Sequence, residues 1–500
     1  MPAYQMLETR FARLSAVEDA LGILGWDRET MMPLGAADRR AEQVATLNVI
    51  AHDMLTAPDM GDLLGEAEQL AATLDAWQAA NLREMRRLHR HAAAVPADLV
   101  EARSRAVSRC EVAWRRARAE SDFPGLLPLL SEVLERQREV AVAKGAALGL
   151  APYDALLDEY DPGTRQADID PLFADLRAGF PALLAEVLEH QARQAPPATL
   201  GGPFPIDAQR ALGEQLMAVV GFDTQRGRLD VSTHPFCGGA TSDVRITTRY
   251  DEAQFASAIM GVLHESGHAL YEQGRPAAWL GQPVGAARGM SLHESQSLLI
   301  EMQVCRSPAF AAVLAPLVQQ SFGAEIAPAD LYRAGIRVRP GFIRVDADEV
   351  TYPAHILVRY ELERALIAGD MQLADLPGAF NAGIKDLLGL DVPNDRLGCL
   401  QDIHWPGGAW GYFPTYTLGA MIAAQLFDAA KRADADVLPS IGRGDFAPLL
   451  AWLRTHVHGR ASLRDTPALV ADATGSVLDA RIYQRHLRTR YLGQEAAALH

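Results

Sequence analysis

Five consecutive residues, from His264 to His268, have the types and spacing of a catalytic zinc site. His264 and His268 lie four positions apart, so on a helix both imidazoles project from one face. Zinc binds imidazole nitrogens at about 2.0–2.1 Å, and a catalytic site keeps one position open for water. Glu265 lies roughly 100° further around the helix, where its carboxylate can take a proton from that water. The motif predicts a zinc-dependent hydrolytic site; the alternative is a surface helix with two solvated histidines.

A helix from about 252 to 273 is expected to carry this motif. Asp251 is its predicted cap, with Gln254 at the capping-box position and Gly274 at its end. Apolar residues recur along it at helical spacing and favour a buried helix over a solvated one. They are Phe255, Ile259, Val262, Leu263 and Leu270.

Two histidines leave zinc short of one protein ligand. Glu294 is the best candidate, because it opens a second helix that the glycine-rich connection 281–289 could fold back onto the first. Ser291 and Glu294 also fit an S-x-x-E capping box, so the residues alone leave ligand and helix cap equally open. His293 is a weaker ligand candidate, since it points to a different face.

A strand is predicted just before the motif helix, because residues 243–250 alternate with period two. Asp243 and Arg245 share one face of it. Asp243 is expected to orient a zinc-bound histidine through its second ring N–H, while Arg245 either binds substrate or neutralises Asp243. The preceding segment 234–239 is expected to be a loop.

The rest of the chain predicts a mainly α-helical protein with only this small β element. Of the 500 residues 7% are aromatic, and helix-forming residues are abundant. Residues 168–190 and 206–220 are predicted amphipathic helices, and Pro353 is expected to kink a helix that follows Asp348. We expect one catalytic domain over residues 1–500, in one or two helical lobes flanking a cleft.

Composition argues against several kinds of partner. A formal charge of −16 disfavours nucleic acid, and no apolar run is long enough to span a bilayer. The first residues lack the pattern of a secretory signal, and the four cysteines have neither zinc-knuckle nor disulfide-framework spacing. A soluble cytoplasmic protein without nucleic-acid or membrane partners is therefore expected.

Taken together, the motifs resemble those of the carboxypeptidase Taq family of zinc carboxypeptidases. Besides His264–His268 and His293–Gln296, further segments match the family in order along nearly the whole chain. They are Leu24-Gly-Trp26-Asp27, Thr30-Met-Met-Pro33, His234-Pro-Phe236, Asp243-x-Arg245-x-Thr247, Ile343-Arg344-x-x-Ala347-Asp348, Gly398-x-x-Gln401-Asp402-x-His404-Trp405 and Gly411-Tyr-Phe-Pro-Thr-Tyr416.

This resemblance implies a mostly helical fold with a deep cleft, a homodimer, and removal of carboxy-terminal residues from peptides with broad specificity. It assigns zinc ligation to His264, His268 and Glu294, and the role of general base to Glu265. Cobalt or manganese would also suit such ligands.

Removal of a terminal residue requires a group that binds the free carboxylate of the peptide. Arginine does so through a two-pronged, charge-assisted fork. Arg344 is the first candidate, with Arg245 second and His234 as a helper. The alternative for Arg344 is an ion pair with Asp348, one helical turn away.

Hydrolysis also requires a donor to the oxyanion that forms at the attacked carbonyl. Related zinc peptidases with this helix pair use tyrosine and histidine, and His404, Tyr412 and Tyr416 are the residues of those types in the segment 398–416. Of the tyrosines we favour Tyr416. The alternative is a packed loop with a structural tyrosine.

Two other functions are compatible with these residues. An oligopeptidase or dipeptidyl carboxypeptidase shares the helix pair but cuts further from the end. A non-catalytic metal-binding scaffold is the other alternative, and Glu265 argues against it because a structural zinc needs no base beside it.

Overall fold

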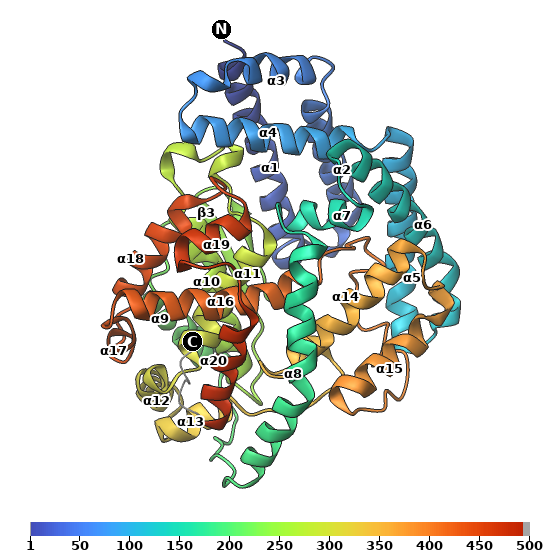
Figure 1. The fold of residues 1–500 in the computed structure, drawn as a ribbon. Helices are drawn as coiled ribbons and strands as arrows, with labels where there is room; N and C mark the ends of the chain where they lie inside the picture. Colours follow the sequence, from blue (N-terminus) through green and yellow to red (C-terminus); the bar gives the residue numbers. More distant parts are fainter. Residues whose placement is uncertain (1, 494–500) are drawn as a thin grey trace.

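The computed structural model describes residues 2–493, and helices make up most of them (Figure 1). The first third of the chain forms helices at the top and the right of Figure 1. They are α1 (Ala3–Thr30), α2 (Ala37–Leu55), α3 (Met60–Gln69), α4 (Ala76–Ala93), α5 (Ala97–Glu120), α6 (Phe123–Leu148) and α7 (Pro152–Tyr160).

A small sheet follows two helices that the sequence predicts well, α8 (Gln166–Ala192) and α9 (Ile206–Val220). The sheet has three strands in the order β1-β3-β2, with β1 parallel and β2 antiparallel to β3. The strands are β1 (Gly227–Val231), β2 (Cys237–Ala240) and β3 (Asp243–Thr248). β3 confirms the predicted strand, although it ends two residues earlier.

The predicted loop over 234–239 is partly wrong, because its second half forms the start of β2. Half of this four-residue strand is glycine, Gly238 and Gly239, so it has no alternating pattern that could reveal it. It forms by pairing with β3, which is a contact between segments rather than a property of either one.

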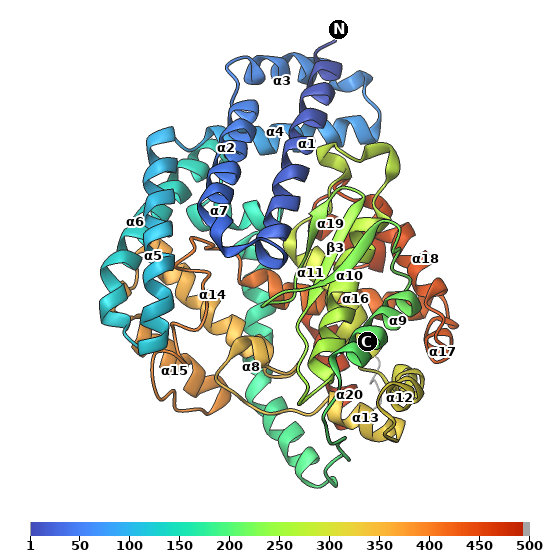
Figure 2. The same ribbon diagram turned by 180° about the vertical axis from the view of Figure 1, so that it is seen from behind.

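Helix α10 (Ala256–Gly274) carries the predicted zinc motif, and Figure 2 shows it beside the sheet. It begins later than predicted, with Phe255 as its N-cap. The capping box expected from Asp251 and Gln254 is therefore wrong, whereas the helix ends at Gly274, one residue beyond the predicted end.

Helix α11 (Met290–Leu298) continues directly into a π-helix, Leu299–Cys305. The remaining helices are α12 (Pro308–Phe322), α13 (Pro328–Gly335), α14 (Tyr352–Ala368), α15 (Leu376–Leu388), α16 (Pro414–Ala433), α17 (Val437–Ile441), α18 (Ala447–His456), α19 (Thr466–Thr474) and α20 (Ala480–Leu492). Pro353 lies in the first turn of α14, where the missing N–H breaks no helical hydrogen bond. The predicted kink at Pro353 is therefore wrong.

Helix α16 lies between the two largest hydrophobic cores. Leu418 and Met421 pack into the core that includes α6, α8, α14 and α15. Ile422 and Leu426 pack into the core that includes α9, α10, α11 and α12. The single domain over residues 1–500 stays a prediction.

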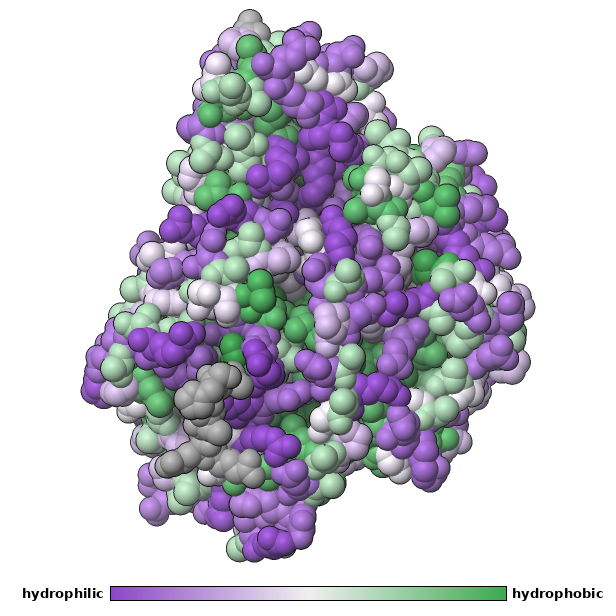
Figure 3. Space-filling model, in the orientation of Figure 1, coloured by the Kyte–Doolittle hydropathy of each residue, from purple (hydrophilic) through white to green (hydrophobic). Residues whose placement is uncertain are grey.

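The face drawn in Figure 3 is mostly polar, with apolar residues in small groups. Within residues 2–493 no single helix is both long and apolar enough to cross a membrane, although two bent helix pairs meet those criteria together.

Candidate active site

Two glycines allow helix α11 to pack in direct contact with its neighbours. A Cβ atom on Gly267 of α10 would lie 2.4 Å from the carbonyl oxygen of Gln296 and 2.6 Å from Cα of Ser297. A Cβ atom on Gly419 of α16 would lie 2.9 Å from Cβ of Glu294. Any side chain at either glycine would push α11 away, so both glycines set the position of Glu294.

His264, His268 and Glu294 converge, and their ligand atoms all lie within 4.8 Å of one another. Oε2 of Glu294 is 3.4 Å from Nε2 of His268 and 3.9 Å from Nε2 of His264. Tetrahedral zinc with ligands at about 2.0–2.1 Å separates neighbouring ligand atoms by about 3.3 Å. The three side chains therefore fit one ion with one coordination position left open.

Glu294 is free for this role because it takes no part in a helix cap. Helix α11 begins at Met290 with Gly289 as its N-cap, so Ser291 already lies inside the helix. The capping box that Ser291 and Glu294 could have formed is therefore wrong.

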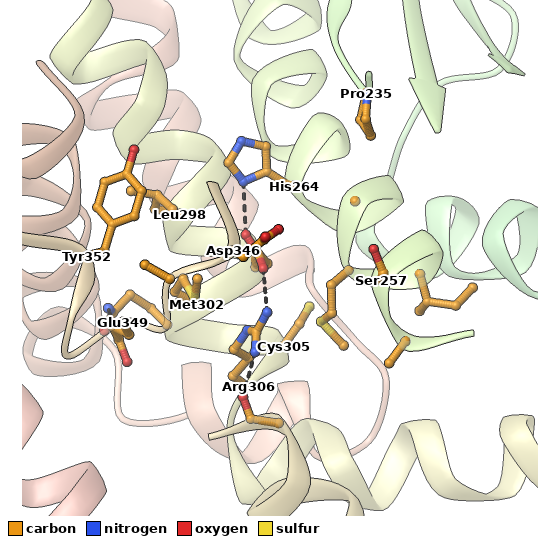
Figure 4. A pocket seen from close by; sticks show the side chains of 18 of the residues that line it. Pro235, Ser257, His264, Leu298, Met302, Cys305, Arg306, Asp346, Glu349 and Tyr352 are labelled. Atoms are coloured by element: carbon orange, nitrogen blue, oxygen red, sulfur yellow. Dashed lines mark hydrogen bonds and ion pairs between the residues drawn. The ribbon is translucent and has the colours of Figure 1, made fainter. Parts of the chain in front are cut away.

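The second ring nitrogen of each histidine also has a partner. Nδ1 of His264 lies 2.9 Å from Oε2 of Glu301, and Oε1 of Glu301 accepts a hydrogen bond from Nη2 of Arg306 at 2.7 Å. Figure 4 draws these contacts as dashed lines that end on His264 and Arg306. Nδ1 of His268 lies 2.6 Å from Nδ1 of His293. Both Nε2 atoms are thus left to face Glu294.

The orienting role predicted for Asp243 is wrong, because Glu301 and His293 occupy the two supporting positions. Asp243 instead pairs with Arg245 at 2.6 Å, which was the alternative for Arg245. The Arg245 guanidinium lies 4.1 Å from the ring centroid of Trp26, so it fastens α1 to the sheet. Within the described chain Arg245 is not among the residues that line the cleft, and its substrate-binding role stays a prediction.

Glu265 lies beside the converging ligand atoms with only 6% of its surface exposed. Burial, together with the charges of Glu294 and Glu301, raises its pKa to about 7, while His264 opposes the rise. A carboxylate that titrates near neutral pH can both accept a proton and return it.

A cleft of about 830 Å³ opens in front of these residues. Its walls come from α10, α11, the π-helix, the segment 344–352 and α16. His234 lines it from the side of the sheet, as does Arg249, for which the sequence predicted no functional role. Both are exposed, and among residues 2–493 Arg249 forms no ion pair. The predicted deep cleft is large enough for a peptide end.

Arg344 lines the cleft, but its guanidinium is already engaged. Nε and Nη2 donate to Oδ1 of Asp402 at 3.0 and 2.8 Å, and Nη1 donates to the Tyr352 hydroxyl at 2.8 Å. Asp402 also binds Arg359 at 2.6 Å. The ion pair predicted between Arg344 and Asp348 is wrong, because Asp348 accepts hydrogen bonds from backbone N–H groups instead. Two arginines on one carboxylate leave a net positive charge beside the cleft.

His404, Tyr412 and Tyr416 form one aromatic group. The Tyr416 hydroxyl lies 3.2 Å from Nε2 of His404, and the rings of Tyr412 and Tyr416 are in edge contact. Of the three only Tyr416 lines the cleft in the part of the chain that the structure describes. Burial raises the pKa of Tyr416 to about 12, so the phenol keeps its proton at neutral pH.

Sequence reasoning missed Glu301, Arg306 and the link from His293 to Glu272. A signal was present for the glutamates. Glu301 follows Glu294 by seven positions, or about two helical turns, and Glu272 follows His268 by four. No local signal could link Arg344 to Asp402, since they are 58 positions apart.

Comparison with known proteins gives one consistent result. Residues 6–491 match the family described as carboxypeptidase Taq (M32) metallopeptidase. Thermostable carboxypeptidase 1 of Thermus thermophilus is 40% identical over 502 residues, which covers 98% of each chain. Carboxypeptidase 1 of Bacillus subtilis is 33% identical over 490 residues, which covers 96% of each chain.

Solved structures agree with these relatives. Trypanosoma cruzi metallocarboxypeptidase 1 superimposes with a TM-score of 0.96 at 41% identity, over 98% of this chain and 99% of that one. The M32 carboxypeptidase of Deinococcus radiodurans gives 0.93 at 35% identity, with the same coverage. The mainly α-helical fold is thereby confirmed. This chain belongs to the carboxypeptidase Taq family and is a metallocarboxypeptidase, a hydrolase of the peptidase class.

Proposed function

We propose that the chain is a zinc-dependent carboxypeptidase that releases single residues from the carboxyl end of peptides with broad specificity. The observation that carries the proposal is the convergence of His264, His268 and Glu294 within 4.8 Å. A zinc ion that catalyses hydrolysis is typically held by two imidazoles and one carboxylate, with one coordination position open for water. Cobalt or manganese could replace zinc at such ligands.

Glu265 is the proposed general base. Zinc bound at these ligands would polarise the scissile carbonyl and lower the pKa of a water molecule to about 7. Glu265 takes the proton from the attacking water and returns it to the departing amine. Its place beside Glu294 in the cleft wall and its raised pKa support this role.

Tyr416 is the proposed donor to the oxyanion. Its phenol lines the same cleft as His264 and Glu294, whereas Tyr412 packs behind it. His404 then donates its Nε2–H to the Tyr416 oxygen and acts as a positioning residue. Burial lowers the pKa of His404 to about 4, so the ring is neutral and can take that tautomer.

Arg344 is the proposed site for the terminal carboxylate. The Arg344 guanidinium already donates to Asp402 through Nη2. The carboxylate of the peptide would therefore bind to Nη1 and to the Tyr352 hydroxyl that accepts from Nη1. The positive charge left over from Arg344, Arg359 and Asp402 supports this placement. His234 could assist from the opposite wall.

Broad specificity is supported by the lining of the cleft. It includes Met260 and Met302, whose unbranched side chains adapt to different partners.

A timed digest of a defined peptide tests the proposal. We expect single residues to leave in order from the carboxyl end, as seen by mass spectrometry. Dipeptide release or internal cuts would instead support the oligopeptidase or dipeptidyl carboxypeptidase alternative.

Chelation separates catalysis from a scaffold role. Removal of the metal should abolish the digest, and added zinc should restore it. Full activity in metal-free protein would contradict the zinc proposal, and no activity with bound zinc would favour the scaffold.

The predicted homodimer rests on the family resemblance alone, and the predicted cytoplasmic location rests on the sequence. Light scattering coupled to size-exclusion chromatography tests the dimer. The measured molar mass should be twice the chain mass of 54.2 kDa.

A further inference from the structure

Each of the two metal-binding histidines is backed by a chain of hydrogen bonds that ends on an arginine. We propose that Glu301 and Glu272 are positioning residues that fix the ring tautomers of His264 and His268 and thereby strengthen metal binding. This inference rests on the proposed metal site.

The first chain runs through the π-helix Leu299–Cys305. Oε2 of Glu301 lies 2.9 Å from Nδ1 of His264, and its Oε1 lies 2.7 Å from Nη2 of Arg306. Nη1 of Arg306 in turn donates to the carbonyl oxygen of Gly335 at 2.5 Å. Glu301 is therefore held at both oxygens, and π-helical turns of this kind are frequent at functional sites.

The second chain connects the last turns of α10 to His293 of α11, whose imidazole is an additional link. Nδ1 of His268 lies 2.6 Å from Nδ1 of His293. Nε2 of His293 lies 2.9 Å from Oε1 of Glu272, and Oε2 of Glu272 lies 2.9 Å from Nε of Arg275. His293, the weaker ligand candidate, thus supports the proposed ligand His268 and does not itself bind the metal.

These contacts admit one arrangement of hydrogens. When Nε2 of a histidine binds a metal, its hydrogen must sit on Nδ1. His264 then donates to Glu301, which as a carboxylate can only accept. His268 donates to Nδ1 of His293, which leaves the His293 hydrogen on Nε2 and directs it to Glu272. Both carboxylates are thus needed to hold the metal-binding tautomers.

The two chains differ in strength. His264 donates directly to a carboxylate, whereas His268 donates to a neutral imidazole and reaches its carboxylate one step later. A hydrogen bond to a charged acceptor is roughly twice as strong as one between neutral groups. Glu301 should therefore matter more than Glu272.

Competition between the protein and a zinc chelator tests the proposal. Loss of such supporting groups typically weakens metal affinity by about 10–100-fold. We expect a change in this range for Glu301→Gln and a smaller but measurable one, about tenfold or less, for Glu272→Gln. Glu301→Asp, which keeps the charge, should retain more affinity than Glu301→Gln.

Glu349→Gln is the matched control. Glu349 is also buried, lines the same cleft and pairs with Arg490 at 2.8 Å, but it contacts neither metal histidine among the described residues. Its loss should lower the melting temperature and leave zinc affinity unchanged.

Two results would overturn the proposal. One is wild-type zinc affinity in Glu301→Gln, and the other is an equal loss in Glu349→Gln, which would indicate a general loss of stability. If the unaltered protein itself bound no zinc, the proposed function would fail first, so the two failures are distinguishable.

Discussion

The two walls of the cleft are built in different ways. On the metal wall, α10 and α11 supply His264, His268 and Glu294, and spacing along each helix decides where the side chains point. On the facing wall, Arg344 and Tyr416 come from segments that are far apart in the sequence. Asp402 binds Arg344, and His404, two residues further along the same loop, contacts Tyr416. The first wall follows from local geometry, whereas the second exists only in the folded chain.

This contrast implies a different dependence on stability. Residues of the metal wall that carry chemistry can be changed with little effect on folding, since the helices persist without them. Groups of the facing wall are themselves buried links, and breaking a buried ion pair typically costs about 3–5 kcal/mol.

The largest expected effect is on catalysis at the metal wall. Glu265→Gln should lower kcat by about 10²–10⁴-fold, because it removes the general base. Zinc content and melting temperature should stay at the wild-type level, which atomic absorption and calorimetry would check. Activity within tenfold of the wild type would refute the assignment.

On the facing wall, Tyr416→Phe should lower kcat by about 10²–10³-fold through loss of an oxyanion donor. Tyr412→Phe is the matched control, since Tyr412 does not line the cleft within residues 2–493, and it should stay within a few-fold of the wild type. If steady-state kinetics showed the larger loss of kcat in Tyr412→Phe, Tyr412 rather than Tyr416 would be the oxyanion donor.

A buried acid that binds the segment 398–416 should make stability depend on pH. Burial raises the pKa of Glu363 to about 7, although Tyr153, Trp405 and Gly411 donate hydrogen bonds to it. A raised carboxyl pKa gives stability that is complete at low pH and lost as pH rises towards 7. Between pH 4.5 and 8 the loss attributable to Glu363 should be about 3 kcal/mol.

Glu363→Gln cannot ionise, so its stability should not show this loss. Denaturant unfolding of both proteins at pH 5 and pH 8 measures it: the wild type should lose stability relative to the variant as pH rises. Parallel pH profiles would contradict the role of Glu363.

The smallest expected effect concerns the terminal carboxylate. The unaltered protein should prefer a free-acid peptide to its amide, and Arg344→Lys should reduce that preference by about 10–100-fold in kcat/KM. Arg249→Gln is the comparison, because Arg249 is exposed and its loss should not disturb folding. If only Arg249→Gln removed the preference, the carboxylate would bind at the sheet side instead.

The sequence predicted the metal wall in most respects. The four-residue spacing of His264 and His268 survives any packing, because helix geometry alone sets it. Periodicity also located α8 and α9 to within two residues. The position of Glu294 was harder to predict, since its proposed ligand role depends on Gly267 and Gly419, which allow α11 to pack closely.

The facing wall could not be predicted to the same degree. Arg344 has an acidic residue, Asp348, at helical spacing, yet its true partner Asp402 lies far along the chain. The orienting role predicted for Asp243 was wrong for the same reason. The position of a residue on a strand does not indicate which side chain of another helix contacts the histidine instead. The motifs in the sequence pointed to these residues, but their contacts became clear only from the folded structure.

The central claim is that His264, His268 and Glu294 hold the catalytic metal, and bound zinc per chain after dialysis tests it most directly. The wild type should retain one zinc ion per chain, and Glu294→Ala should lose it while its helical circular dichroism stays unchanged. Retention of zinc at the wild-type level in Glu294→Ala would contradict the account.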